Sequence, residues 1–246
     1  MNVNYIMLTL VTAVNTRFFN FLKQIIKNVT ETSNKSNTEI RIVVYNLGMT
    51  DEELDEIKSF SNIILENFDF SRYPDHVDNI LNFAWKPIII HDACEKYGGL
   101  VHWMDSRNLY DNFSKLIEIL EKDYIYSARS SGTVRKWTHP KCLEYMNGHK
   151  YVDLRCRNAA FVGINYNINW VREFVKEWRD LALIKECICP DGSSLSNHRQ
   201  DQSILTILYY RYHEIYNFNK NRVSDHKLYL NNSLRQTHNN LLDKYQ

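Results

Sequence analysis

The sequence is poor in residues that interrupt regular structure, because its 246 residues include only 7 Gly and 4 Pro. It also lacks a long apolar run. The opening run at residues 5–11 is far shorter than the roughly 20 residues that cross a bilayer. No basic flank precedes it and no small-residue cleavage site follows it, which is not typical of a signal peptide. We therefore expect a buried first strand there, no transmembrane segment and a cytoplasmic protein.

Net charge is also nearly absent, at +1, and the basic residues are spread along the chain. Nucleic acid is therefore not an expected partner, because its binding needs many phosphate contacts. The five cysteines include the C-x-C pair Cys187 and Cys189, but no second pair with zinc-ligand spacing follows. We expect free thiols in a reducing compartment. The abundance of Asn, Lys and Ile fits an AT-rich coding genome, such as that of a virus.

What the sequence does contain is an ordinary globular composition, with 44% hydrophobic and 24% charged residues. We predict a single domain over residues 1–246, with a core at about 5–212 and a polar C-terminal tail at about 217–246. Apolar runs predict strands over residues 5–11, 40–45, 63–65, 100–104, 124–127 and 158–164. Helical patterns cover residues 18–29, 51–59, 79–97, 114–121, 168–184 and 200–212.

Alternating strands and helices favour an α/β fold with a doubly wound, mainly parallel, Rossmann-like sheet and flanking helices. In such sheets, ligands bind outside the carboxyl ends of the strands. Two polar segments fall at such ends, Thr12–Asn15 after the first strand and Asp105–Asn108 after the strand at residues 100–104. The pattern therefore places the candidate ligand site at these two segments.

The segment Lys96-Tyr97-Gly98-Gly99-Leu100-Val101-His102-Trp103-Met104-Asp105-Ser106-Arg107 resembles the core of GT-A nucleotide-sugar glycosyltransferases, in which a Gly-Gly turn leads into a buried strand ending in D-x-D. The stretch Asn158-Ala159-Ala160-Phe161-Val162-Gly163 resembles that family's Asn-(Ser/Ala)-Gly strand. The stretch Asp201-Gln202-Ser203-Ile204-Leu205 resembles the Asp-Gln-x-x-Leu helix start of its glycogenin-like and galactosyltransferase branch. The resemblance covers about residues 5–212.

The resemblance implies transfer of a hexose from a nucleoside-diphosphate sugar, with a UDP-linked donor favoured, to a glycan, protein or small-molecule acceptor. It implies catalytic roles for Asp201 and Gln202, with Asp191 as a further candidate base. It implies donor binding by the following residues: Thr12, Ala13, Asn15, Lys86, Asp105, Ser106, Arg107 and Asn158. Retention of the anomeric configuration is favoured over inversion, which needs an aligned carboxylate base. The polar loop 187–199 is expected to close over the donor or the acceptor.

One departure affects the metal. Arg107 stands where the family's second Asp is expected, so the usual pair of carboxylates for Mn²⁺ or Mg²⁺ is incomplete. Two hypotheses follow: either Arg107 contacts the diphosphate directly, since guanidinium suits phosphate, or a metal stays on Asp105 with the late His226 as partner.

Simpler structural roles compete with these assignments. Asp105 and Asp201 are residue types that favour helix starts, Lys86 is also consistent with a surface lysine, and His102 is expected to be a satisfied core histidine. Two other functions remain open. A nucleotidyltransferase shares a similar sheet but usually carries a Gly-rich, basic loop straight after the first strand, and no Gly stands there in this sequence. A degenerate transferase fold acting as a binding module would explain the lost Asp.

Overall fold

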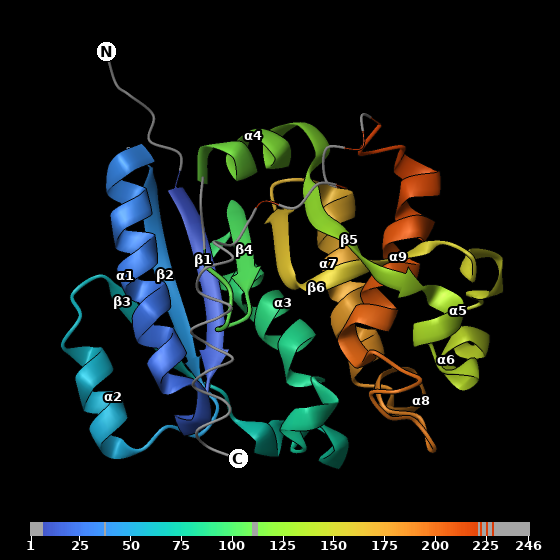
Figure 1. Cartoon of the computed structure of the whole chain (residues 1–246), viewed down its shortest axis with the longest axis horizontal. Coiled ribbons are helices and arrows are strands. Elements are labelled where there is room, and N and C mark those ends of the chain that lie inside the picture. The colour runs from blue at the N-terminus through green and yellow to red at the C-terminus, as the bar shows by residue number, and fades with distance from the viewer. Residues whose placement is uncertain are drawn as a thin grey trace.

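The computed structural model describes residues 7–36, 38–109 and 113–220, together with residues 222, 225 and 228. Within them lies a six-stranded sheet in the order β3-β2-β1-β4-β6-β5. Its strands are β1 (Met7–Val14), β2 (Glu39–Asn46), β3 (Ile63–Asn67), β4 (Leu100–Met104), β5 (Ile125–Thr133) and β6 (Arg155–Asn165). Figure 1 shows β1 and β4 side by side, with both arrows pointing down.

The sheet is mostly parallel, as predicted. β3, β2, β1 and β4 pair in parallel, whereas β6 runs antiparallel to both of its neighbours, β4 and β5. The register pairs Met104 at the end of β4 with Phe161 in the middle of β6. Because of this reversal, the first residues of β6 lie beyond the carboxyl end of β4, where the sequence predicts a ligand site.

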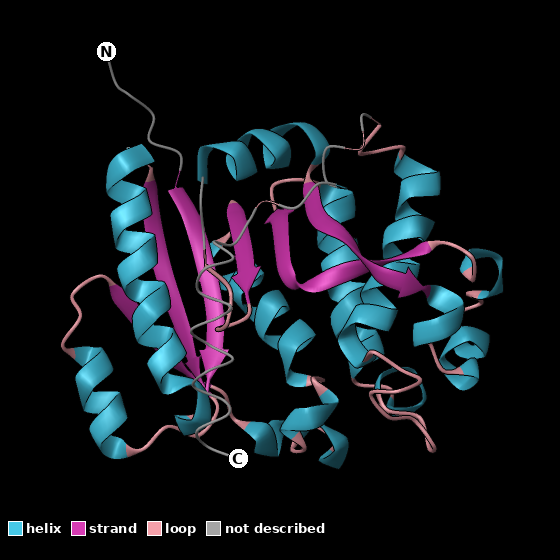
Figure 2. Cartoon of the chain, in the orientation of Figure 1, coloured by secondary structure: helices cyan, strands magenta, loops and turns pink. Residues whose placement is uncertain are grey.

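Helices cover both faces, which is the doubly wound arrangement (Figure 2). They are α1 (Phe19–Ser36), α2 (Asp51–Lys58), α3 (Trp85–Tyr97), α4 (Phe113–Asp123), α5 (Val134–Trp137), α6 (Pro140–Tyr145), α7 (Asn169–Ala182), α8 (Lys185–Ile188) and α9 (Gln200–Tyr216). One apolar core joins the sheet to α3, α7 and α9, and a second joins it to α1 and α4. Strand β1 supplies both cores, with Leu8 and Leu10 on one side and Val11 and Ala13 on the other.

Local signals define the elements next to the site. Thr50 caps α2 with a capping box to Glu53, as its sequence predicts. Pro87 lies in the first turn of α3, where its missing N–H costs nothing. Gly98 and Gly99 adopt φ values of 61° and 65°, a left-handed conformation that suits glycine and turns the chain from α3 into β4.

Three predictions about local structure were wrong. β1 continues to Val14, so Thr12 and Ala13 lie inside the strand and only Asn15 follows it. The stretch 132–148, where the sequence analysis places no helix or strand, contains α5 and α6, because His139 caps a helix that has Pro140 in its first turn. Short helix α8 includes the start of the predicted loop 187–199. Among the described helices, none is long and apolar enough to cross a membrane.

Candidate active site

A buried lysine joins two carboxylates at the carboxyl end of β4. Lys86 lies in the first turn of α3, Asp105 directly follows β4, and Asp201 lies in the first turn of α9. The Lys86 Nζ atom is 3.0 Å from Asp105 Oδ1 and 3.0 Å from Asp201 Oδ2. The side chains of Lys86 and Asp201 are only 4% and 7% exposed, whereas that of Asp105 is 35% exposed. Asp105 is therefore the member of this triad that faces solvent.

Two tryptophans fix the carboxylate-bearing segments. The indole N–H of Trp103 donates to Asp105 Oδ1 at 2.7 Å, and that of Trp178 donates to the Asp201 carbonyl at 3.1 Å. The backbone N–H of Asp105 also donates to the Ala160 carbonyl, which ties it to β6. Sequence reasoning missed Trp103 as a site residue. Its position two residues before Asp105 was the available signal, because residues i and i+2 of an extended chain share a face.

The electrostatics of the triad favour a charged lysine. Burial alone lowers the pKa of Lys86, but the Asp105 and Asp201 carboxylates outweigh it, and the pKa is raised above its ordinary value. Burial raises the pKa of Asp201, and Lys86 opposes that rise. The ammonium also lies 5.4 Å from the ring centroid of Phe83 and 5.7 Å from that of Trp103, so apolar and aromatic surface surrounds it.

The end of β1 carries buried polar atoms that lack a partner. Thr12 is fully buried, and within the described part of the chain neither Thr12 Oγ1 nor Asn15 Oδ1 makes a hydrogen bond. Ala13 is buried beside them. Native proteins rarely leave such groups unsatisfied, so each one calls for an explanation.

The other predicted donor residues next to Asp105 have varied surroundings. Ser106 is buried, whereas Arg107 is exposed and its guanidinium lies over the rings of Phe18 and Phe21, at 5.1 and 5.7 Å from their centroids. Asn158 is half-buried, and its side-chain oxygen accepts from the Ala160 N–H at 2.7 Å. Asn158 therefore shapes the part of β6 that holds Asp105.

The remaining predicted residues are not part of the triad. Gln202 follows Asp201 in α9 and is half-buried. Asp191 is exposed and forms a 2.6 Å ion pair with Lys185. The base of the predicted loop 187–199 is closed by buried His198, whose Nε2–H donates to the carbonyls of Cys187 and Ile188. His226 lies outside the described residues.

The described residues do not complete the ligand set of a divalent metal. They contain no cluster of three or more His, Cys, Asp or Glu side chains suited to a metal. Both carboxylates at the site already contact Lys86, and the three groups together carry one excess negative charge when all are ionised.

His102 is a buried core histidine, as predicted. Its Nδ1–H donates to the Val162 carbonyl, and burial lowers its pKa to about 3. The five cysteines are free thiols, four of them buried.

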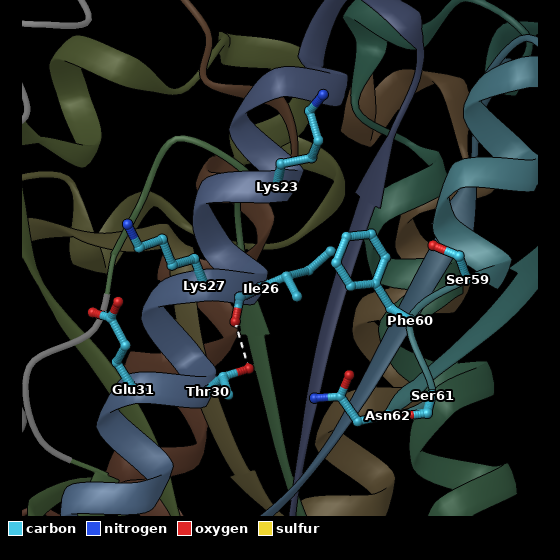
Figure 3. Close-up of a pocket in the computed structure, with 9 residues that line it drawn as sticks. All are labelled: Lys23, Ile26, Lys27, Thr30, Glu31, Ser59, Phe60, Ser61 and Asn62. Carbon is cyan, nitrogen blue, oxygen red and sulfur yellow. Dashed lines mark hydrogen bonds between the residues drawn. The ribbon is translucent and has the colours of Figure 1, made fainter.

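Two surface hollows lie apart from the triad. One, of about 690 Å³, lies between α1 and the turn that joins α2 to β3, and its lining includes Lys23, Lys27 and Phe60 (Figure 3). The other, of about 640 Å³, is bordered by His76, Asn82 and other residues before α3, and by Lys185. Neither is lined by Lys86, Asp105 or Asp201.

The chain was compared with protein families, with curated proteins and with solved structures. Residues 2–91 match the family described as "Protein of unknown function (DUF1647)". Comparison with curated proteins finds no match. Among solved structures, the apo form of the bifunctional glycosyltransferase WbbM is similar with a TM-score of 0.56 and 13% identity, over 86% of this chain and 39% of that chain. The present chain thus spans well under half of WbbM.

Two further solved structures are similar. The galactosyltransferase LgtC, in complex with donor and acceptor sugar analogues, has a TM-score of 0.54 and 17% identity over 82% of this chain and 70% of that chain. Core-mannan synthase A from Aspergillus fumigatus, in its Mn/GDP form, has a TM-score of 0.50 and 8% identity over 82% of this chain and 68% of that chain. Together with the mostly parallel six-stranded sheet and its flanking helices, these similarities show that the chain has the fold of the GT-A glycosyltransferases.

Proposed function

We propose that this chain transfers a hexose from a nucleoside-diphosphate sugar, with UDP as the favoured nucleotide, to an acceptor hydroxyl. The observation that carries the proposal is the Lys86–Asp105–Asp201 triad at the carboxyl end of β4. This is the edge where ligands bind in doubly wound sheets. The three side chains come from three separate elements, and the sequence resemblance implies a role for each of the three residues.

The end of β1 supports a nucleoside site. Thr12 Oγ1 and Asn15 Oδ1 are buried polar atoms without a hydrogen-bond partner in the described chain. The polar edge of a base and the hydroxyls of a ribose would satisfy them, since both offer donors and acceptors. Ala13 lies between them in the sequence and has a small side chain.

Lys86 supports a diphosphate site. An ammonium group has three N–H donors, and the two carboxylates engage it from two directions. We propose that a phosphate oxygen of the donor approaches the same ammonium. Negative charge grows on the diphosphate as the glycosidic bond breaks, so a fixed, nearly buried cation stabilises the transition state more than the bound donor.

Asp201 and Gln202 support the reacting sugar. Their carboxylate and amide oxygens are suited to stabilising positive charge that develops at the anomeric carbon. Because Lys86 and Trp178 hold Asp201 in place, we assign it this electrostatic role and favour retention of configuration. Proton NMR of the new glycosidic linkage tests that assignment directly.

The decisive experiment is a panel of UDP- and GDP-sugars incubated with the purified chain, with nucleotide release and product formation measured with and without Mn²⁺. The proposal expects hydrolysis or transfer of at least one donor, and its loss in Lys86→Met but not in Lys96→Met. Lys96 is the matched control, because it pairs with Glu66 at the surface. Pyrophosphate release from a nucleoside triphosphate and a sugar phosphate would identify a nucleotidyltransferase instead. Binding without turnover would identify a binding module.

A further inference from the structure

The indole ring of Trp137 forms an aromatic platform directly beside the residues that lead into α9. Trp137, the last residue of α5, is half-buried. Its carbonyl accepts from the Arg199 N–H at 3.0 Å and from Ser203 Oγ at 2.6 Å. Two residues further on, the His139 N–H donates to Nδ1 of His198. These contacts bind the Trp137 segment to the chain that carries Asp201.

Two cations lie on this indole ring. The Arg199 guanidinium carbon is 4.1 Å from the ring centroid, and the Lys136 ammonium is 4.8 Å from it. Across the described ranges, neither Arg199 nor Lys136 forms an ion pair with a carboxylate. The neighbouring Arg135 differs, because it pairs with Asp153 at 2.9 Å. The platform therefore carries positive charge that the surrounding described residues leave uncompensated.

Glycine makes room for the platform. A Cβ atom on Gly132 would lie 2.2 Å from Nε1 of Trp137, which is far inside van der Waals contact. Gly132 also has a φ of 79°, a conformation that other residues rarely adopt. The end of β5 at Gly132 therefore packs directly against the Trp137 ring.

The platform adjoins the triad. Arg199 precedes Asp201 by two residues, so their Cα atoms are no more than about 7 Å apart. On its other side, Arg199 is close to β6: burial raises the pKa of Cys156 to about 11, and the Arg199 charge opposes that rise. Cys156 is two residues before Asn158, which shapes the chain around Asp105.

We propose that Trp137, Arg199 and Lys136 form an acceptor subsite for a sugar that carries an anionic group, either a phosphate or a carboxylate. The indole offers apolar surface to the sugar ring, the guanidinium offers paired N–H donors to the anion, and the ammonium adds a second positive charge. This inference rests on the proposed glycosyl transfer, because it assigns the acceptor of that reaction. The donor diphosphate is assigned separately, to Lys86.

The test uses the indole N–H resonances of the five tryptophans, recorded by ¹H–¹⁵N NMR on the full chain and assigned with Trp137→Phe and Trp103→Phe. The probes are glucose 6-phosphate, glucuronate, methyl glucoside and inorganic phosphate. Glucose 6-phosphate and glucuronate are expected to shift the Trp137 resonance and to bind at least tenfold more tightly than methyl glucoside or inorganic phosphate. The variant Lys136→Gln/Arg199→Gln is expected to lose that tenfold preference, whereas Arg135→Gln keeps it.

The inference is overturned by equal affinity for methyl glucoside, by unchanged affinity in the double variant, or by a shift confined to Trp103, which reports the donor site. Inorganic phosphate binding as tightly as glucose 6-phosphate also contradicts it, because the sugar would then contribute nothing. The result of the nucleotide-sugar panel is judged separately from the NMR titration. If no donor binds but glucose 6-phosphate still shifts Trp137, the transferase proposal fails and the anionic-sugar site remains.

Discussion

The indole nitrogen of Trp103 lies 2.7 Å from Oδ1 of Asp105, the same oxygen that lies 3.0 Å from the Lys86 ammonium. One carboxylate oxygen thus receives a neutral donor and a cation together, and the rotation of the Asp105 side chain is fixed before any ligand arrives. Preorganised groups of this kind avoid reorganisation during the reaction.

Removing the indole N–H tests this relationship. Trp103→Phe keeps an aromatic ring in the core but leaves Asp105 without its neutral donor. Hydrogen bonds to charged groups contribute about 1.5–3 kcal/mol, so we expect kcat/KM for the best donor to fall about tenfold or more. The melting temperature controls for folding. Unchanged kcat/KM in a folded variant would show that Lys86 alone orients Asp105.

Replacing Lys86 has a larger effect. Lys86→Met leaves two carboxylates near each other without a cation, and breaking a buried ion pair costs about 3–5 kcal/mol. Because Asp105 is partly exposed, we expect the lower end of this range. The free energy of unfolding, measured by urea denaturation, should fall by about 3 kcal/mol. The double variant Lys86→Met/Asp201→Asn should recover part of it, since it also removes a buried charge. A double variant less stable than the single one would contradict this account.

The metal hypotheses separate by chelation. If Lys86 and Arg107 supply the positive charge, activity measured in excess EDTA should stay within about twofold of the untreated enzyme. Loss of a Lewis acid would remove several kcal/mol of transition-state stabilisation and lower the rate far more than twofold. Arg107→Asp restores two carboxylates and should create a dependence on Mn²⁺, measured as activity regained on adding the metal after chelation. Abolition of wild-type activity by EDTA, with recovery on Mn²⁺, supports the version with Asp105 and His226.

Acid should weaken the fold through His198. The His139 N–H donates to Nδ1 of His198, so Nε2 carries the proton of a neutral ring, and burial lowers its pKa from 6.5 to about 4. The unfolded chain therefore binds more protons between those two values, and stability falls as pH falls through that window. The difference corresponds to up to about 3 kcal/mol. His198→Gln should flatten this part of the stability profile, measured by urea unfolding from pH 7 to pH 4. An unchanged slope would assign the effect to another group.

The chain after α9 should depend on one ion-pair network. Asp225 accepts from the buried Arg157 at 2.8 Å and pairs with Arg129 at 2.9 Å, while the Leu228 N–H donates to the Tyr126 hydroxyl. Asp225→Asn removes the charge that neutralises Arg157, so limited proteolysis should cut after α9 several times faster than in the wild type. Asp180→Asn is the control, because Asp180 pairs with Lys176 on the surface of α7. Equal cleavage of both variants would contradict the role of Asp225.

The sequence predicted the parts of the site that belong to regular elements. The apolar run 100–104 and the Gly-Gly turn located Asp105 because a strand buried on both faces reads as a near-continuous apolar run, and Pro87 marked the start of α3. The pairing of Lys86 with Asp201 was not readable, because it depends on how α9 packs against β6 and α7 and on how α7 packs against α3. Composition also gave no sign that Arg107 would lie over Phe18 and Phe21.

Short elements held by caps escaped prediction for another reason. α5 and α6 are too brief to show helical periodicity, and they are fixed by a cap at His139 and by contacts of Trp137 with Arg199 and Ser203. β1 was predicted too short because polar Thr12 interrupts its apolar run, although the side chain is fully buried.

The dependence of the triad on α9 has a consequence for the order of assembly. Lys86 and Asp105 are synthesised early, whereas Asp201 belongs to the last described helix, so a nascent chain that ends before α9 carries an incomplete site. Contacts between distant segments form slowly, because closing a long loop costs entropy before the contact stabilises it. Donor binding should therefore appear only after α9 has docked, and recovery of nucleotide binding during refolding would measure when this helix docks.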